Sequence, residues 1–496
     1  MDITLKREAL DRYVPVFDGE AGREFTEEVV VPDTLPDAAS VADAQGVLCV
    51  REKLTSDGAV TLAGTVSVSV LYEPTDGGAY PRCVELELPV SVTMDAPGAD
   101  EDCRTTARMT LCSVEARAVN SRKLSVRVEV FAQARCYRRE SVLLACGLDG
   151  DTQAHTLVRT AEAVVVSDVR EKAFVITDEL TVPAGLSGGV RVVSRRVAVI
   201  PEDVKYVRGK AILRGRAVSE LIFADGDGEH RAARYETEIS QLMELDCTAE
   251  EAMPTAALML TGAYFDMPEY GEGTGRVQAE LHFTMQCVCR EKRQIPYLAD
   301  IYANRTVLAP AFTETELETD ARPVSMRQTV VGRSEPAAEG DLFCVSASVG
   351  PTAADAVSVR TSVLIRLVSR TADGRLESSK CRLTAEFTVT GMADGARLTD
   401  VTVTAADVFS AGSDVRAVLQ MDALLSTGGV LRSVSEVTED AEAYAAQPRT
   451  PSVVLVRIPA GTELWSVAKR FGSSVDAISA ANGGRCDGLI LVPKAR

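Results

Sequence analysis

The chain has 496 residues, a formal net charge of −19 and an apolar fraction of 46%. This length suggests about three domains, and the apolar fraction is large enough for several buried cores. The acidic excess argues against binding to nucleic acid or to anionic membranes, because both require a basic protein surface.

Three long segments share an alternating apolar pattern that ends in an Asp-Gly pair. They are residues 60–77, 211–228 and 357–374, and their Asp-Gly pairs lie 151 and 146 residues apart. Asp-Gly favours a turn with positive φ, so each segment predicts the first strand of a β-hairpin. A period near 150 residues is too long for a solenoid repeat, which indicates homologous domains instead.

Each of the three copies also ends in an alternating stretch, at residues 124–130, 277–283 and 415–421. Alternation with period two predicts a strand that buries one face and exposes the other. The expected fold is therefore mainly β. It comprises three homologous antiparallel β-domains, each a sandwich or partly open barrel. We expect them at residues 1–150, 151–298 and 299–434.

The first copy carries two short motifs. Residues 31–37 read VPDTLPD, and Leu71-Tyr72 end the first hairpin strand. This combination resembles the SPOCS domain, in which a PDxxPD segment precedes an alternating strand that ends in Leu-Tyr. Asp300-Ile301-Tyr302 is similar to the D-x-Y segment of the same family. The second and third copies have Ile-Phe and Val-Ser in place of Leu-Tyr, so their assignment depends on spacing and alternation.

Residues 435–451 read SEVTEDAEAYAAQPRTP. This segment is acidic, rich in alanine, and contains two prolines near its end. It predicts an acidic linker with a short helical start.

Residues 452–496 predict a small βααβ domain. An apolar strand at 453–458 is followed by a Pro-Ala-Gly turn. Thr462 is the expected N-cap of a helix whose apolar residues recur at i, i+3, i+4 and i+7. Gly472 is expected to end this helix, and Ser473 with Asp476 predicts a capping box for a second helix. A strand at 489–492 completes the domain.

This C-terminal pattern resembles the LysM domain. The matching residues are Gly461, Leu464-Trp465-Ser466, Ala468-Lys469-Arg470, Gly472, Val475, Asn482 and Val492-Pro493. LysM domains bind their ligands between the loop after the first strand and the loop before the second. The resemblance therefore implies a partner-binding site formed by these loops and an adjacent basic face. Its expected residues are Gly461, Thr462, Glu463, Lys469, Arg470, Asn482, Gly483 and Arg485.

Two features of this domain leave alternatives open. Residues 451–496 contain six basic and three acidic side chains, a net charge of +3. This excess fits either a docking surface for an acidic partner or an ordinary solvated surface. Trp465, the only tryptophan, is expected to be a structural anchor in the core. The alternative is a partly exposed aromatic side chain at the edge of a binding groove.

Catalytic and metal sites are not expected. The three histidines, His155, His230 and His282, lie far apart in sequence and none is beside an evident nucleophile. The twelve cysteines lack the paired spacing of a zinc site, and we expect reduced thiols, no metal and no cofactor. No apolar run approaches the ~20 residues of a membrane helix, and the N-terminal segment has no apolar signal region.

Three SPOCS-like copies followed by one LysM domain resemble the SipL-like family of clostridial spore-coat morphogenetic proteins. The resemblance implies a non-enzymatic adaptor in the mother-cell cytoplasm, at the forespore surface and spore coat. Such proteins bind the coat-basement ATPase through the LysM domain and help other coat proteins to surround the forespore. The first LysM loop has Gly461-Thr462-Glu463 where the family usually has Gly-Asp-Thr, and the second loop is shortened and lacks the usual Gly-Gln before the last strand. These departures favour a protein ligand. The alternatives are a peptidoglycan or cortex glycan-binding protein and, with less support, a hydrolase targeted to the wall.

Overall fold

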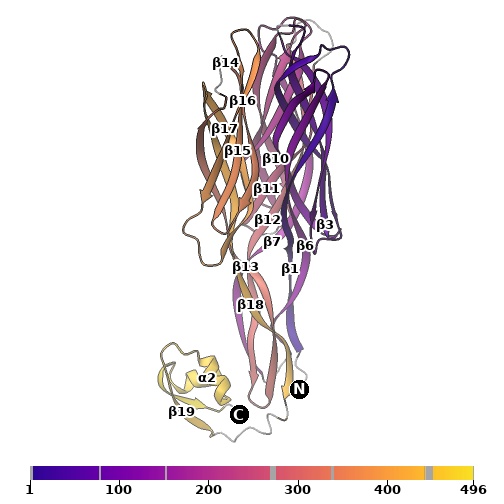
Figure 1. The fold of residues 1–496 in the computed structure, drawn as a ribbon. Coiled ribbons are helices and arrows are strands. Elements are labelled where there is room, and N and C mark those ends of the chain that lie inside the picture. The colour runs from indigo at the N-terminus through magenta and orange to yellow at the C-terminus, as the bar shows by residue number, and fades with distance from the viewer. Residues whose placement is uncertain are drawn as a thin grey trace.

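The computed structural model describes all residues except 1–3, 78–79, 151–153, 248, 268–274, 337–339, 441, 443–450 and 495–496. Antiparallel β-strands make up most of the described chain, which confirms the mainly β fold class. The molecule is elongated, with strands running along its long axis (Figure 1). A small α-helical and β-stranded domain lies beside the narrow end.

Within the described residues, eighteen strands before the C-terminal domain form three units of six. Unit 1 contains β1 (Thr4–Val30), β2 (Ala38–Ser56), β3 (Ala59–Pro74), β4 (Arg82–Asp95), β5 (Arg104–Asn120) and β6 (Lys123–Asp149). Unit 2 contains β7 (Ala154–Thr181), β8 (Arg191–Val207), β9 (Lys210–Ala224), β10 (His230–Glu244), β11 (Ala252–Asp266) and β12 (Arg276–Ala303). Unit 3 contains β13 (Val307–Arg333), β14 (Asp341–Ala354), β15 (Ser358–Arg370), β16 (Leu376–Thr388), β17 (Ala396–Ala411) and β18 (Asp414–Asp440).

The strand order is the same in all three units. The second, third and fourth strands form one sheet, and the sixth strand pairs with both the first and the fifth. The two sheets of each unit enclose an apolar core. Val126 and Val128 in β6 are fully buried, as the alternating pattern predicts. Each unit is thus a β-sandwich.

Irregularities in the sheets recur at matching places, which supports a common origin of the units. Leu71, Ile222 and Val368 all lie in the middle strand of a three-stranded sheet. In every unit the neighbouring strand has a register shift immediately before the residue that pairs with this position. The predicted Asp-Gly turns also form, with φ values of 77°, 89° and 86° at Gly77, Gly228 and Gly374.

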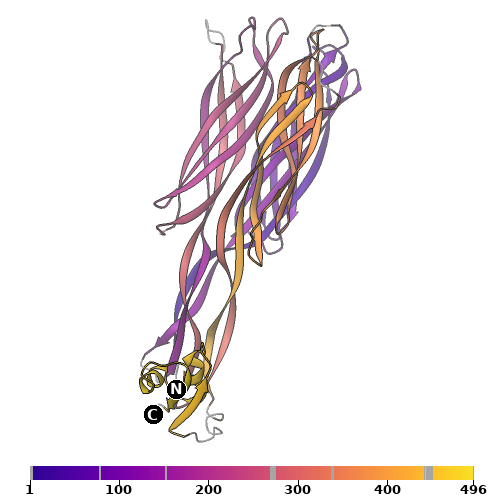
Figure 2. The ribbon, with the colours of Figure 1, turned by 90° about the vertical axis from the view of Figure 1, so that its left-hand side faces the viewer.

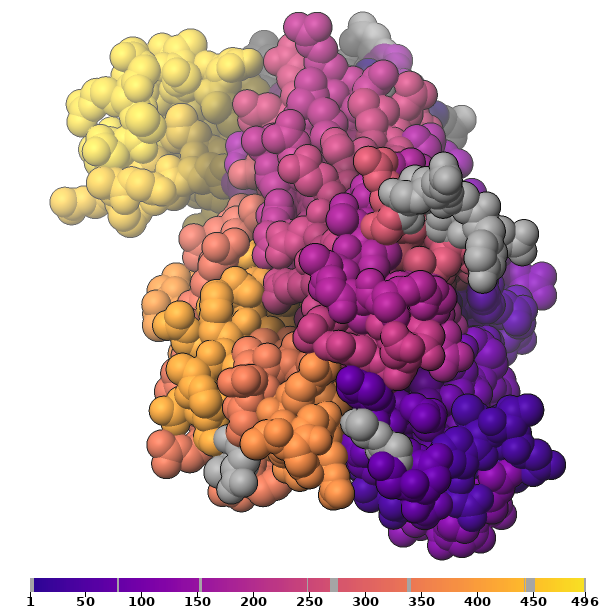
Figure 3. Space-filling view, turned by 90° about the horizontal axis from the view of Figure 1, so that it is seen from above, coloured from indigo at the N-terminus to yellow at the C-terminus, as the bar shows by residue number. Residues whose placement is uncertain are grey.

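The three units pack around a common centre (Figure 3). Leu71, Ile222 and Val368 are at most 2% exposed and belong to one apolar cluster. Equivalent residues from three units therefore meet at this centre. The long sheets of the units are joined by isolated pairings, Tyr13 with Val166 and Val164 with Glu318.

An ionic contact also joins the three units. Arg135 of unit 1 and Arg290 of unit 2 each lie 2.6 Å from a different carboxylate oxygen of Asp400 in unit 3. The two arginines are 9% and 2% exposed. Burial would raise the pKa of Asp400, but the two guanidinium groups hold it below its ordinary value. Asp400 thus remains charged between two buried cations.

The first and last strands of each unit continue beyond the sandwich as a two-stranded ribbon. The three ribbons pack together into a narrow stem (Figures 1 and 2). Its apolar interior draws residues from all three units, including Leu10, Ile295 and Leu431. A second cluster, with Ala145, Ile301 and Val434 among its members, has the same three-unit composition.

The stem shifts two of the expected boundaries. Residues 299–303 were expected in the third domain, but they continue β12 and pair with β7. Residues 435–440 were expected in the linker with a helical start, but they continue β18 and pair with β13. In both cases the ladder of backbone hydrogen bonds extends the strand beyond the point where the alternating pattern fades. Most of the remaining linker lies outside the described residues.

The SPOCS motifs close one end of the first sandwich. Arg122 donates to the carboxylates of Asp33 at 2.6 Å and Asp37 at 3.1 Å, and to the carbonyl of Leu35 at 3.0 Å. The hydroxyl of the fully buried Tyr72 donates to the carbonyl of Pro36 at 2.9 Å. Arg122 therefore pairs with both carboxylates of the PDxxPD segment, and Tyr72 of the Leu-Tyr pair bonds to the same segment, which gives both motifs a structural explanation.

Candidate functional site

The C-terminal domain has the expected βααβ order. Its elements are β19 (Val453–Ile458), α2 (Leu464–Phe471), α3 (Val475–Ala481) and β20 (Gly488–Pro493). The two strands pair in antiparallel register, and the helices pack against one face of this ribbon. Gly472 ends α2 with a φ of 64°, as predicted.

Both expected N-caps are wrong by one residue. The N-cap of α2 is Glu463, and Thr462 lies in the preceding turn, where its amide donates to the carbonyl of Pro459. The N-cap of α3 is Ser474, whose hydroxyl accepts from the amide of Ala477 at 3.1 Å. Ser473 is instead buried, and its hydroxyl donates to the carbonyl of Pro493. Because Ser473 is buried and bonded to Pro493, its hydroxyl does not cap α3.

The cap at Ser474 gives a direct test of local stability. Ser474→Ala should lower the unfolding free energy of this domain by about 1 kcal/mol, because it removes the acceptor for an otherwise unpaired helix amide. The fluorescence of Trp465, the only tryptophan, reports the unfolding of this domain during denaturant titration. Ser452→Ala, at an exposed position before β19, is the control. Equal midpoints for the two variants would contradict the assigned cap.

The core of the domain contains a residue from the stem. Tyr302 of β12 is 5% exposed and packs in the same cluster as Ala468 and Ile478. Its hydroxyl donates to the carbonyl of Ser473 at 2.9 Å. Its ring lies 4.8 Å from that of Trp465 in an edge-on arrangement. The C-terminal domain is therefore docked on the D-x-Y segment of the stem.

The carboxylate of Asp300 also stabilises the contact between the stem and the C-terminal domain. Its carboxylate accepts from the indole Nε1 of Trp465 at 2.8 Å and from the Nζ of Lys469 at 2.6 Å. Burial would raise the pKa of Asp300, but these two hydrogen bonds hold it below its ordinary value. Arg159 of β7 adds a more exposed ion pair with Glu463 at 2.6 Å. Two of the expected binding-site residues, Glu463 and Lys469, thus face the stem, together with the expected anchor Trp465.

The other expected site residues divide into two groups. Asn482 has a structural contact, since its amide nitrogen donates to the carbonyls of Ile478 and Leu491 and its amide oxygen accepts from the Leu491 amide. The remaining residues lie on the surface, with Thr462 part-buried. They are Gly461, Thr462, Arg470, Gly483 and Arg485. Gly461 and Gly483 have φ values of 83° and 59°, so their loops require residues that tolerate left-handed geometry.

Sequence reasoning missed an apolar surface on this domain. Val453, Leu455, Leu489 and Leu491 are 53%, 56%, 58% and 43% exposed. Leu455 pairs directly with Leu491, and the other two flank this pair diagonally. We call these four residues the sheet face; it lies opposite the helices. The strand VVLVRI is apolar at consecutive positions, so alternation could not distinguish its buried side from its exposed side.

The histidines have structural contacts. His155 shares a hydrogen bond with Asn304 at 2.8 Å, and His282 contacts Glu280 at 2.5 Å. His230 is buried, and this burial lowers its pKa to about 4. The described part of the chain contains no cluster of three or more metal-ligating side chains. It also contains no helix long and apolar enough to cross a membrane.

Comparisons with known proteins identify two domains. The family described as "SipL, SPOCS domain" matches residues 37–119, which run from the end of the PDxxPD segment through β5. The LysM domain family matches residues 463–493. No curated protein and no solved structure gives a significant match. Residues 37–119 are therefore a SPOCS domain of the SipL type, and residues 463–493 are a LysM domain.

Proposed function

We propose that this chain is a non-enzymatic adaptor in spore-coat assembly. The SPOCS and LysM domains are binding domains, and the SipL resemblance points to sporulation. In this proposal the LysM domain docks a coat-basement ATPase, and the three β-units recruit or scaffold other coat proteins. The protein acts in the mother-cell cytoplasm, at the forespore surface.

The observation that carries this proposal is the exposed sheet face of the LysM domain. Four large aliphatic side chains lie side by side on a two-stranded ribbon, each more than two-fifths exposed. Contiguous exposed apolar surface is typical of sites that bind another protein. The exposed Arg457 on the same side of β19 adds a positive charge at its edge. This surface suits an apolar protein patch with an acidic rim.

The shape of the molecule fits an adaptor. The sandwiches lie at one end, and the LysM domain lies beside the far end of the stem (Figure 2). Two partners can therefore bind the chain without competing for the same surface. The contact of Tyr302 and Asp300 with the LysM domain gives this spacing a defined orientation.

The proposal is tested by comparing two ligands with the purified full chain. Biolayer interferometry with the coat-basement ATPase from the same organism should show saturable binding. Sedimentation with purified peptidoglycan should leave the chain in the supernatant. Glycan binding would use the two exposed loops, so retention on peptidoglycan that Arg485→Glu abolishes, without binding to the ATPase, would replace the adaptor with the glycan-binding alternative.

The stem contact predicts a local effect of Asp300→Ala. This variant leaves Lys469 and the Trp465 indole without their acceptor, so it should weaken docking of the LysM domain by about 1–3 kcal/mol. Acrylamide should then quench Trp465 fluorescence more strongly than in the wild type. Asp487→Ala, in an exposed loop, is the matched control.

The same variant distinguishes two docking surfaces. If the partner binds the sheet face, Asp300→Ala should leave the affinity for the ATPase within twofold of wild type. A large gain in affinity would show instead that the partner competes with the stem for Lys469 and Trp465.

A further inference from the structure

A cavity lies where the three units meet. Its volume is about 190 Å³, and every unit contributes strands to its lining: β2 and β5 of unit 1, β8 and β11 of unit 2, and β14, β15, β16 and β17 of unit 3. The charged side chains in its lining are Arg108, Arg196, Arg366 and Lys380, and none of its lining residues is acidic. The lining is therefore strongly basic in a chain with an overall negative charge.

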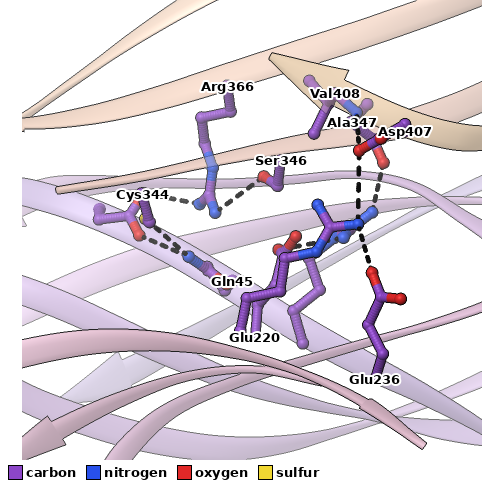
Figure 4. Close-up of polar contacts among 12 residues, drawn as sticks. Gln45, Glu220, Glu236, Cys344, Ser346, Ala347, Arg366, Asp407 and Val408 are labelled. Atoms are coloured by element: carbon purple, nitrogen blue, oxygen red, sulfur yellow. Dashed lines mark hydrogen bonds and ion pairs between the residues drawn. The ribbon is translucent and has the colours of Figure 1, made fainter. Parts of the chain in front are cut away.

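Three of these four cations are neutralised by acidic residues beside the cavity. The pairs are Arg366 with Asp43 at 2.6 Å, Arg196 with Glu220 at 3.1 Å and Lys380 with Glu115 at 3.6 Å. Figure 4 shows two hydrogen bonds of the lining residues. Arg366 donates to the hydroxyl of Ser346, and the amide nitrogen of Gln45 donates to the sulfur of Cys344. These contacts fix the positions of the lining side chains.

Arg108 is the fourth cation. Its neighbours in β5, Ala107 and Met109, are buried in the core of unit 1, so Arg108 points away from that core towards the space between units. Among the described residues it makes no hydrogen bond and no ion pair. Burial lowers the pKa of its guanidinium group. Arg108 is only part-buried, but a part-buried cation without a counter-charge still carries a desolvation cost, which an anion in the cavity would offset.

Two further polar groups in the lining also lack partners within the described chain. Gln45 is 4% exposed and its Oε1 accepts no hydrogen bond, while Thr404 is 5% exposed and its Oγ1 has no partner. Both residues line the cavity. The cavity therefore offers a positively charged donor, a carbonyl acceptor and a hydroxyl that can donate or accept.

We propose that this cavity binds a small protonated oxyanion of the phosphate class. Arg108 neutralises its charge, Gln45 Oε1 accepts from its hydroxyl, and Thr404 donates to another oxygen. Hydrogen phosphate carries both the negative oxygens and the hydroxyl that this set of groups requires. Sulfate carries no proton at neutral pH, so it lacks the donor for Gln45. The bound anion would bridge units 1 and 3.

The test uses isothermal titration of the full chain with inorganic phosphate in a chloride buffer of constant ionic strength. The wild type should bind one phosphate saturably, and sulfate should bind more weakly. Arg108→Met should weaken phosphate binding at least ~10-fold, because a charge-assisted pair is lost. Arg117→Met, an exposed arginine on the same strand, should bind as the wild type does.

Thermal unfolding separates binding from folding. Arg108→Met removes an uncompensated charge, so without phosphate its Tm should equal or exceed that of the wild type. Phosphate should raise the Tm of the wild type and of Arg117→Met, but not that of Arg108→Met. The proposal is overturned if the wild type shows no saturation up to roughly 10 mM phosphate. Equal phosphate affinity of Arg108→Met and wild type would also overturn it.

Discussion

Asp400→Asn should lower the unfolding free energy of the chain by about 3–5 kcal/mol, the largest effect on stability that we expect. The substitution leaves Arg290 buried without its carboxylate partner, and it leaves Arg135 with only the longer contact to Asp18 at 3.5 Å. Asparagine tolerates the positive φ of 53° at this position, so the variant isolates the loss of charge from backbone strain. Differential scanning calorimetry of the full chain measures the effect.

The exposed Asp394→Asn is the control for Asp400→Asn, and it should leave the thermal unfolding transition unchanged.

The ionised carboxylate of Asp400 also makes the stability of the chain depend on pH. Because the folded pKa of Asp400 lies below its ordinary value, its contribution is complete above the unfolded pKa near 3.8 and is lost as pH falls through the folded value. The difference in stability between wild type and Asp400→Asn should shrink below about pH 4. A difference that persists unchanged to lower pH would contradict an ionic role.

Leu491→Glu should weaken binding of the coat-basement ATPase by at least ~30-fold, which corresponds to about 2 kcal/mol at the centre of an interface. The new carboxylate would be desolvated against an apolar partner surface. Leu491 is 43% exposed in the sheet face, so the LysM domain should remain folded. Biolayer interferometry of the full chain gives the affinity, and Trp465 fluorescence checks the fold.

Two matched variants make this result specific. Leu455→Glu, directly across the ribbon from Leu491, should have a similar effect. Val331→Glu places the same charge on an apolar side chain that is 71% exposed in unit 3, and it should bind the ATPase as the wild type does. Normal binding by both sheet-face variants would remove this surface from the proposed docking site.

Local patterns in the sequence predicted the strands well but not the contacts between units. The alternation in residues 124–130 and the turn at Gly77 depend on neighbouring residues, and both form as expected. The contact of Arg135 and Arg290 with Asp400 spans 265 and 110 residues. The periodicity of a sequence cannot predict these ion pairs, because they depend on how the folded units pack against one another. The stem was missed for the same reason.

The candidate site shows the same limit. Gly472 and the order of strands and helices were predicted from local signals. The role of Asp300 could not be predicted from local signals, because its hydrogen bond with Trp465 joins residues 165 positions apart in sequence. The D-x-Y segment was recognised in the sequence as a family feature, and only the structure reveals that it holds the LysM domain.

The stem has a mechanical consequence. Every passage from one unit to the next, between Asp149 and Ala154 and between Ala303 and Val307, lies at its free end, as does Asp440, the last residue of β18. A pull between the sandwiches and the C-terminal domain therefore acts along the strands and loads the backbone hydrogen bonds of a ribbon in parallel. A pull between the N-terminus and the C-terminal domain separates ribbons from the same end, one bond at a time. The molecule should thus resist tension far better along its length than across its tip.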